Sequence, residues 1–95
     1  MISITFAEFE ARKKAEGYDA VLERKWAPNA VADTHTHPFD ASALVIEGGL
    51  ALTVNGQTRH LQPGDTFEVP HGVVHAEHYG PQGALFWAAR RGPSA

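Results

Sequence analysis

The sequence contains no cysteine. This absence excludes disulfide bonds, thiolate metal sites and cysteine nucleophiles together. Any metal ion must therefore be bound by nitrogen and oxygen, and six histidines provide the nitrogen donors. The length of 95 residues predicts a single domain over residues 1–95, and a hydrophobic content of 43% is typical of a folded protein rather than a disordered one.

Two further absences restrict the location and partners of the protein. No hydrophobic run approaches the length of about 18 residues that a membrane-spanning helix needs, and no signal-peptide pattern opens the chain. The formal net charge is −3, and no stretch is rich in lysine and arginine. These features predict a cytoplasmic protein with no nucleic-acid or membrane partner. Because so short a chain buries a small core, we also expect a homodimer.

The first part of the chain has the pattern of one short helix. Thr5 and Glu8 have the spacing of a capping box, in which the side chain of each residue accepts a hydrogen bond from the backbone N–H of the other. Three basic residues then precede Gly17, where positive charge and a glycine both favour the end of a helix. We expect an amphipathic helix over about residues 5–16.

From residue 18 onward, short runs with strand patterning alternate with glycine and proline turns. Asn55-Gly56 between two such runs predicts a tight hairpin, and we expect Gly48-Gly49 and residues 80–83 to separate further strands. No helical pattern lies among the strands, which excludes βαβ units and favours an antiparallel sandwich or barrel over about residues 18–90. The expected eight or nine strands include 18–26, 31–37, 42–47, 50–54, 57–61, 66–69, 73–79 and 84–89.

Three histidines could meet at one point inside such a barrel. His35 and His37 are two residues apart on a predicted strand, so their side chains share one face. His75 lies on another strand about forty residues later. Three neutral imidazoles with open positions suit zinc, iron, nickel, copper or manganese. Two histidines at this spacing also fit a pair of polar strand residues, so the pair alone does not decide between the two interpretations.

The second half of the chain resembles a motif of the cupin family. That motif is a glycine, five residues, Pro-x-Gly, two residues, a histidine, three residues and an asparagine. Gly64, Pro70, Gly72 and His75 match it at every spacing, and Tyr79 stands in the position of the asparagine.

The other cupin motif is matched in part. It consists of a glycine, five residues, His-x-His, three or four residues, a glutamate, six residues and a glycine. Asn29 stands in the first glycine position, His35 and His37 follow at the family spacing, and Gly48 ends the motif. Ala41 occupies the glutamate position.

The resemblance covers about residues 20–90 and implies an all-β, double-stranded β-helix (the jelly-roll cupin barrel) with a short N-terminal helix. It also implies a divalent transition metal held by His35, His37 and His75. Family members include dioxygenases and sugar isomerases, so the implied function is to bind or convert a small organic molecule. Whether the protein is an enzyme stays open, since the alternative is a non-catalytic binding or sensor barrel with an empty or structural metal pocket.

The oxygen ligand is the unsettled part of this predicted site, because Ala41 cannot bind a metal. Water or substrate could complete a three-histidine site, Asp40 could turn inward through a bulge, or the pocket could be vestigial. Titratable side chains that could lie near the metal are Asp40, Glu68, His71, Glu77 and Tyr79.

The remaining polar side chains have plainer interpretations. We expect His60, His71 and His78 on the outside of the barrel. Arg90 and Arg91 fit a solvated pair near the C-terminus, although an arginine near the mouth of the pocket could hold a carboxylate. Small residues at inward positions, Ala41, Ala43, Ala51 and Ala88, suggest room for a small ligand.

Overall fold

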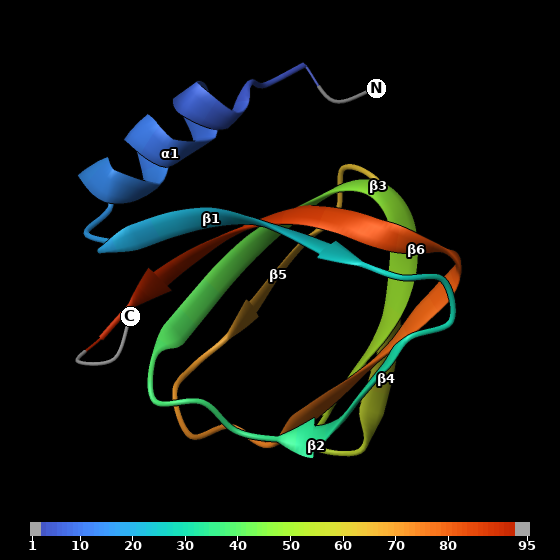
Figure 1. Cartoon of the computed structure of the whole chain (residues 1–95). Helices are drawn as coiled ribbons and strands as arrows, with labels where there is room; N and C mark the ends of the chain where they lie inside the picture. Colours follow the sequence, from blue (N-terminus) through green and yellow to red (C-terminus); the bar gives the residue numbers. More distant parts are fainter. Residues whose placement is uncertain (1–2, 93–95) are drawn as a thin grey trace.

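The computed structural model of the chain describes residues 3–92 (Figure 1). It confirms the prediction of an all-β fold with a short N-terminal helix. Within the described residues no helix is long and apolar enough to cross a membrane. The predicted single domain also includes residues 1, 2 and 93–95, which lie outside the described part. The elements are α1 (Phe6–Ala15), β1 (Ala20–Trp26), β2 (Val31–His35), β3 (Asp40–Val54), β4 (Gln57–Leu61), β5 (Thr66–Val69) and β6 (His75–Arg91).

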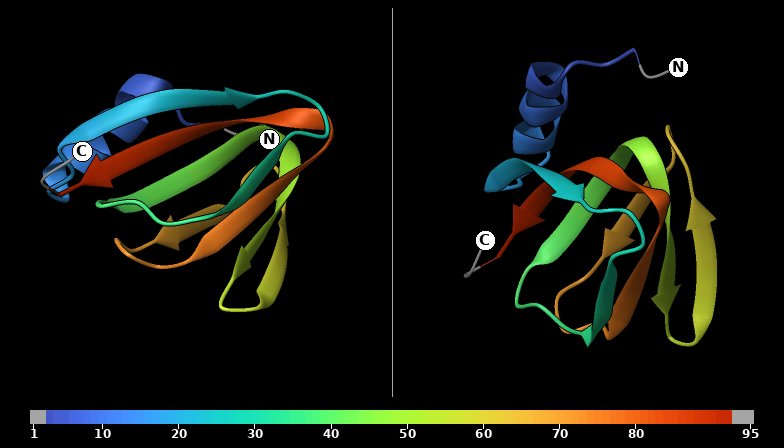
Figure 2. Two further views of the ribbon diagram at one scale, coloured as in Figure 1. Left: turned by 60° about the horizontal axis from the view of Figure 1, so that its bottom comes forward. Right: turned by 45° about the vertical axis from the view of Figure 1, so that its right-hand side comes forward.

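Two long strands, β3 and β6, form the middle of the fold. They pair antiparallel along their whole length, from Asp40 opposite Arg91 to Val54 opposite His75. Strands β1 and β5 flank one half of this pair, and β2 and β4 flank the other half. Because β3 and β6 bend between the two halves, the chain rolls into a barrel-like sandwich with α1 outside it (Figures 1 and 2).

The prediction that glycines separate strands at residues 48–49 and 80–83 was wrong. Both segments lie inside continuous strands, so there are six strands among residues 3–92 rather than eight or nine. Gly48 and Gly83 have φ angles of 72° and 68°, and a Cβ atom on Gly48 would overlap the carbonyl oxygen of Gly83. Register shifts after Val45 and Gly48 mark bulges at the same corner. The glycines therefore allow β3 and β6 to bend from one layer into the next.

Helix α1 begins where its capping box predicted. The Thr5 hydroxyl accepts a hydrogen bond from the Glu8 backbone N–H (3.1 Å), and the Glu8 carboxylate accepts one from the Thr5 backbone N–H (2.9 Å). The rings of Phe6 and Phe9 lie 5.5 and 5.7 Å from that of Trp87 on β6. This aromatic group fixes the helix to the outer face of the barrel.

The hydrophobic core lies between the two layers. Side chains alternate along β5, since Phe67 and Val69 are buried whereas Thr66 and Glu68 are exposed. Part of the core also lines a cavity. The core cluster consists of Ala43, Val45, Leu50, Leu52, Leu61, Phe67, Val69, Tyr79, Ala84, Phe86 and Ala88.

Candidate metal centre

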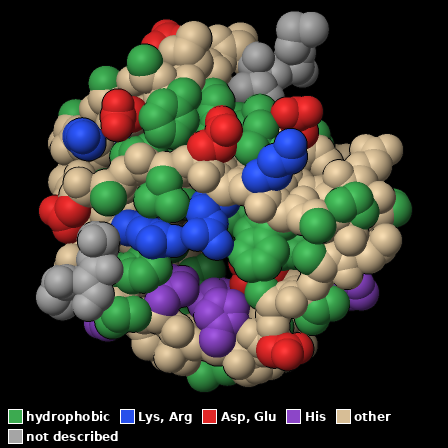
Figure 3. Space-filling view, in the orientation of Figure 1, with side chains coloured by type: hydrophobic (Ala, Val, Ile, Leu, Met, Phe, Trp, Pro, Cys, Tyr) green, Lys and Arg blue, Asp and Glu red, His purple; other side chains and the backbone are tan. Residues whose placement is uncertain are grey.

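A cavity of about 190 Å³ lies between the two layers of the barrel. Aromatic and small apolar side chains form most of its lining, including three of the alanines expected to leave room there, Ala41, Ala43 and Ala88. Ala51 is not in this lining. Figure 3 shows a hollow on this face of the molecule, with basic side chains on one side and histidines on the other. The polar lining residues are Arg24, His35, His37, His75, Glu77 and Arg90.

The three histidines predicted to meet all line this cavity. His35 ends β2 and pairs in register with His75, the first residue of β6, and their ring centroids are 4.2 Å apart. His37 lies 4.8 Å from His75 but 6.2 Å from His35. Strand β2 ends at His35 rather than at His37 as predicted, because Pro38 cannot continue the ladder of hydrogen bonds. His35 and His37 nevertheless both face the cavity, as expected for residues two apart on an extended chain.

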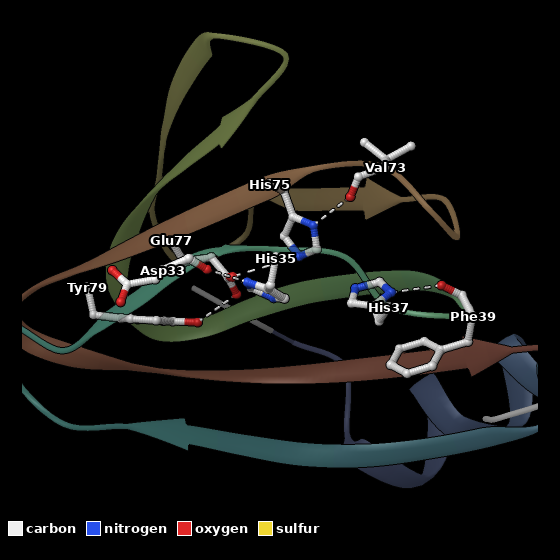
Figure 4. Close-up of polar contacts among 8 residues, drawn as sticks. All are labelled: Asp33, His35, His37, Phe39, Val73, His75, Glu77 and Tyr79. Carbon is white, nitrogen blue, oxygen red and sulfur yellow. Dashed lines mark hydrogen bonds and ion pairs between the residues drawn. The ribbon is translucent and has the colours of Figure 1, made fainter.

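Each of these imidazoles is oriented by a hydrogen bond from its Nδ1 atom to a backbone carbonyl oxygen (Figure 4). Because a carbonyl oxygen can only accept, each neutral ring must carry its proton on Nδ1 and leave a lone pair on Nε2. Metal-binding histidines are typically held in this way by a second hydrogen bond. The acceptors of His35, His37 and His75 are Asp33 (2.6 Å), Phe39 (2.9 Å) and Val73 (3.0 Å), respectively.

Glu77 supplies a carboxylate beside the histidines. Its Oε2 atom lies 3.7 Å from Nε2 of His35 and 3.8 Å from Nε2 of His75, and the three ligand atoms lie within 4.8 Å of one another. Tyr79 donates a hydrogen bond to the other oxygen, Oε1, at 3.1 Å. Oε2 is buried and has no hydrogen-bond partner among residues 3–92. Since an unpaired buried carboxylate oxygen is costly, a cation held by this group fits the residues present.

The sequence contains a signal for Glu77, which is one of the five titratable residues named above as candidates near the metal. Glu77 is two residues after His75 on β6, so the strand alternation that relates neighbouring ligands also places these two side chains on one face. Figure 4 shows both side chains directed toward His35. The missing information was which face of β6 points inward, which depends on strand pairing.

Asp40 does not replace the missing glutamate from the position next to Ala41. Ala41 faces the cavity, so its neighbour points outward, as the strand period requires. The Asp40 carboxylate accepts hydrogen bonds from the His71 backbone and ring, both at 2.9 Å, and lies 3.5 Å from the Arg91 guanidinium. The hydrogen bonds from His71 lower the pKa of Asp40 below its usual value. The Asp40 carboxylate therefore forms contacts at the surface and is not part of the candidate metal centre.

Other sequence-based expectations have mixed outcomes. His60, His71 and His78 are exposed, as predicted. The prediction that Arg90 and Arg91 form a solvated pair was wrong for Arg90, which lines the cavity because alternate residues of β6 face inward.

Burial controls the charge states of two groups near the cavity. It is the largest cause that lowers the pKa of His37 and raises the pKa of Tyr79, and the nearby Glu77 carboxylate raises the latter further. Tyr79 therefore keeps its proton and remains a donor to Glu77. His37 stays neutral at physiological pH, which leaves its Nε2 lone pair available.

Residues 23–80 match the family model of the cupin domain, and this match covers more than half of the chain. The chain belongs to the cupin family. The small-cupin resemblance of the two motifs is thus confirmed. No curated protein matches this cupin in sequence.

Solved structures share the fold of this cupin. KdgF from Halomonas sp. is 25% identical, with a TM-score of 0.66 over 78% of this chain and 70% of its own. A protein with a double-stranded β-helix domain from Klebsiella pneumoniae subsp. pneumoniae is 26% identical, with a TM-score of 0.67 over 79% and 69%. A protein of unknown function from Rhizobium leguminosarum bv. viciae is 22% identical, with a TM-score of 0.72 over 97% of both chains. This last likeness shows the fold alone, and together they confirm the double-stranded β-helix.

Proposed function

We propose that this cupin binds a divalent transition metal ion through His35, His75 and Glu77, with His37 as a further donor. The ion would face the cavity, where the protein binds or converts a small organic molecule. One observation supports the proposal most directly: the buried Oε2 atom of Glu77 faces the Nε2 atoms of two histidines and lacks any other partner among the described residues.

The donor set suits zinc, iron, nickel, copper or manganese, because imidazole nitrogen and carboxylate oxygen are good ligands for each of these ions. Such an ion, when bound, polarises an oxygen atom of a small molecule as a Lewis acid. The chain itself holds the donors in place: backbone carbonyls orient the three rings, and Tyr79 orients Glu77.

Glu77 takes over the role that the family motif gives to the position of Ala41. Both residues line the cavity, but Ala41 lies on β3 and Glu77 on β6. Transfer of the carboxylate to β6 leaves only a methyl group on the β3 wall. The space above Ala41 is then open to a ligand beside the metal.

Metal content measured by mass spectrometry tests the site. Untagged protein, stripped with a chelator, is loaded with Zn²⁺ and desalted, and we expect stoichiometric metal in the wild type. His75→Ala and Glu77→Gln should lose most of it, because each substitution removes a ligand. His78→Ala is the matched control, since His78 lies on the same strand but is exposed.

Two results would contradict the proposal. One is a wild-type protein that retains none of the five metals after separate loading. The other is equal metal content in His75→Ala and His78→Ala. The homodimer and the cytoplasmic location stay predictions, for which sedimentation and fractionation are the measurements.

A further inference from the structure

The cavity contains two arginines in addition to its histidines. Arg24 on β1 and Arg90 on β6 both line it. In the antiparallel pairing of these strands, Arg24 is opposite Phe86 and Arg90 is opposite Ala20, so both arginines lie on the inner face with Ala88 between them.

Neither arginine has an acidic partner in the described part of the chain. The ion pairs formed among residues 3–92 include Arg91, which contacts Asp40, but not Arg24 or Arg90. Burial lowers the pKa of Arg90, and the positive charge of Arg24 lowers it further. Two like charges in a partly buried cavity are unfavourable without an anion, and a divalent metal beside them would increase the excess of positive charge.

The donors of these arginines are free to meet a ligand. The guanidinium carbon of Arg90 lies 4.5 Å from the ring centroid of Phe39, and that of Arg24 lies 5.5 Å from that of Trp26. Contact with an aromatic ring holds a guanidinium group while its N–H donors remain available for a planar acceptor. The cavity therefore offers two guanidinium groups with unused donors.

We propose that this cavity binds a small organic carboxylate, whose carboxylate group is held by Arg24 and Arg90. A hydroxyl or carbonyl oxygen next to the carboxylate would then face the metal centre, so the inference names the ligand class of the function proposed above and rests on it. A guanidinium fork matches the two oxygens of a carboxylate. The cavity of about 190 Å³ is small, so we expect a ligand with a short carbon chain.

Inorganic phosphate is also an anion that arginine side chains bind, but it suits this cavity less well than a carboxylate does. Phosphate sites commonly use backbone N–H groups of a helix N-terminus or a glycine-rich loop. The lining of this cavity comes from strands β1, β2, β3, β5 and β6 and from the segment that follows β2. Side chains, rather than backbone amides, are therefore the donors here.

Lactate and its neutral amide, lactamide, provide a matched pair of probes. Zn²⁺-loaded protein is titrated with each, and binding is followed through amide shifts in ¹H–¹⁵N spectra. We expect lactate to bind at least about 10-fold more tightly than lactamide, because charge-assisted hydrogen bonds are the stronger kind. Arg24→Gln and Arg90→Gln should each weaken lactate binding by about 10- to 100-fold and leave lactamide binding unchanged. Arg91→Gln, on the outer face, is the control and should bind lactate as the wild type does.

Three outcomes would overturn the carboxylate site. These are equal binding of lactate and lactamide, no binding of either lactate or pyruvate at millimolar concentration, and tighter binding of inorganic phosphate than of both carboxylates. Metal content of the two arginine variants separates this inference from the proposed function, since both variants should retain Zn²⁺. If the wild type retains no metal, the proposed function fails, and the preference for lactate in metal-free protein still tests the arginine pair.

Discussion

At the scale of single residues, the candidate metal centre depends on the two oxygen atoms of Glu77. One accepts a hydrogen bond from Tyr79, and the other faces His35 and His75 without a further partner among the described residues. The family motif has an asparagine where Tyr79 stands. A tyrosine here reaches the carboxylate two residues earlier on the same strand and fixes its orientation.

Tyr79→Phe tests this orienting contact. The ring of Tyr79 stacks on Trp26 at 4.7 Å, and phenylalanine keeps that stacking while it removes the hydroxyl donor. We expect the affinity for Zn²⁺ to fall about 10-fold, as is typical when a hydrogen bond to a ligand is lost. Competition with a chromophoric chelator measures the affinity. Tyr18→Phe, outside the cavity, should change nothing, and an unchanged affinity in Tyr79→Phe would show that Glu77 does not depend on this hydrogen bond.

At the scale of elements, the bends in β3 and β6 give the cavity its shape. Gly83 has a φ angle of 68°, and a Cβ atom there would overlap the carbonyl oxygen of Trp26, a residue that lines the cavity. Only glycine allows the end of β1 to approach the corner of β6 this closely. Gly83 thus helps to position Trp26, which forms part of the cavity wall.

Gly83→Ala and Gly56→Ala form a matched pair at this scale. Gly56 also has a positive φ, 77°, but no atom lies within 4 Å of a Cβ built there. We expect Gly56→Ala to lower the free energy of unfolding by about 1 kcal/mol, from backbone strain alone. Gly83→Ala should lower it by about 3 kcal/mol, because overlap with the backbone adds to that strain. Urea unfolding measures both free energies. Equal decreases in the two variants would show that the close approach of Gly83 to Trp26 adds no cost to the backbone strain.

At the scale of the whole molecule, the candidate metal centre joins parts that are distant in sequence. His35 and His37 come from the end of β2 and the segment after it, whereas His75 and Glu77 come from the start of β6. A bound ion would link this connecting segment to the central strand pair. Metal binding should therefore be coupled to the stability of the fold.

Removal of metal should lower the melting temperature. At a free Zn²⁺ concentration of about 100 times the dissociation constant, binding to the folded state alone adds about 2.7 kcal/mol to the free energy of unfolding. For a domain of this size, the corresponding rise in melting temperature is about 10 °C or more. Calorimetry with and without Zn²⁺ measures it, and His35→Ala should show little rise. The same rise in both proteins would place the stabilising ion elsewhere.

The sequence alone determined the fold class and three of the candidate ligands. Thr5 and Glu8 marked the start of the helix, Asn55-Gly56 marked a hairpin, and the spacing around His75 identified the family. These features are local or have fixed spacing, so they can be recognised without knowledge of strand pairing.

Tertiary structure decided the features that depend on which strands pair and on which face of each strand points into the barrel. It showed that glycines bend β3 and β6 rather than divide them, because the close approach of Gly48 and Gly83 is a contact between strands. It placed Glu77 and Arg90 inside the cavity and Asp40 outside it. Alternation along a strand relates neighbours to one another, but only the packing of the two layers fixes which face is inward. The absence of cysteine restricted the donors to nitrogen and oxygen, and the pairing of β6 identified Glu77 as the oxygen donor that we propose.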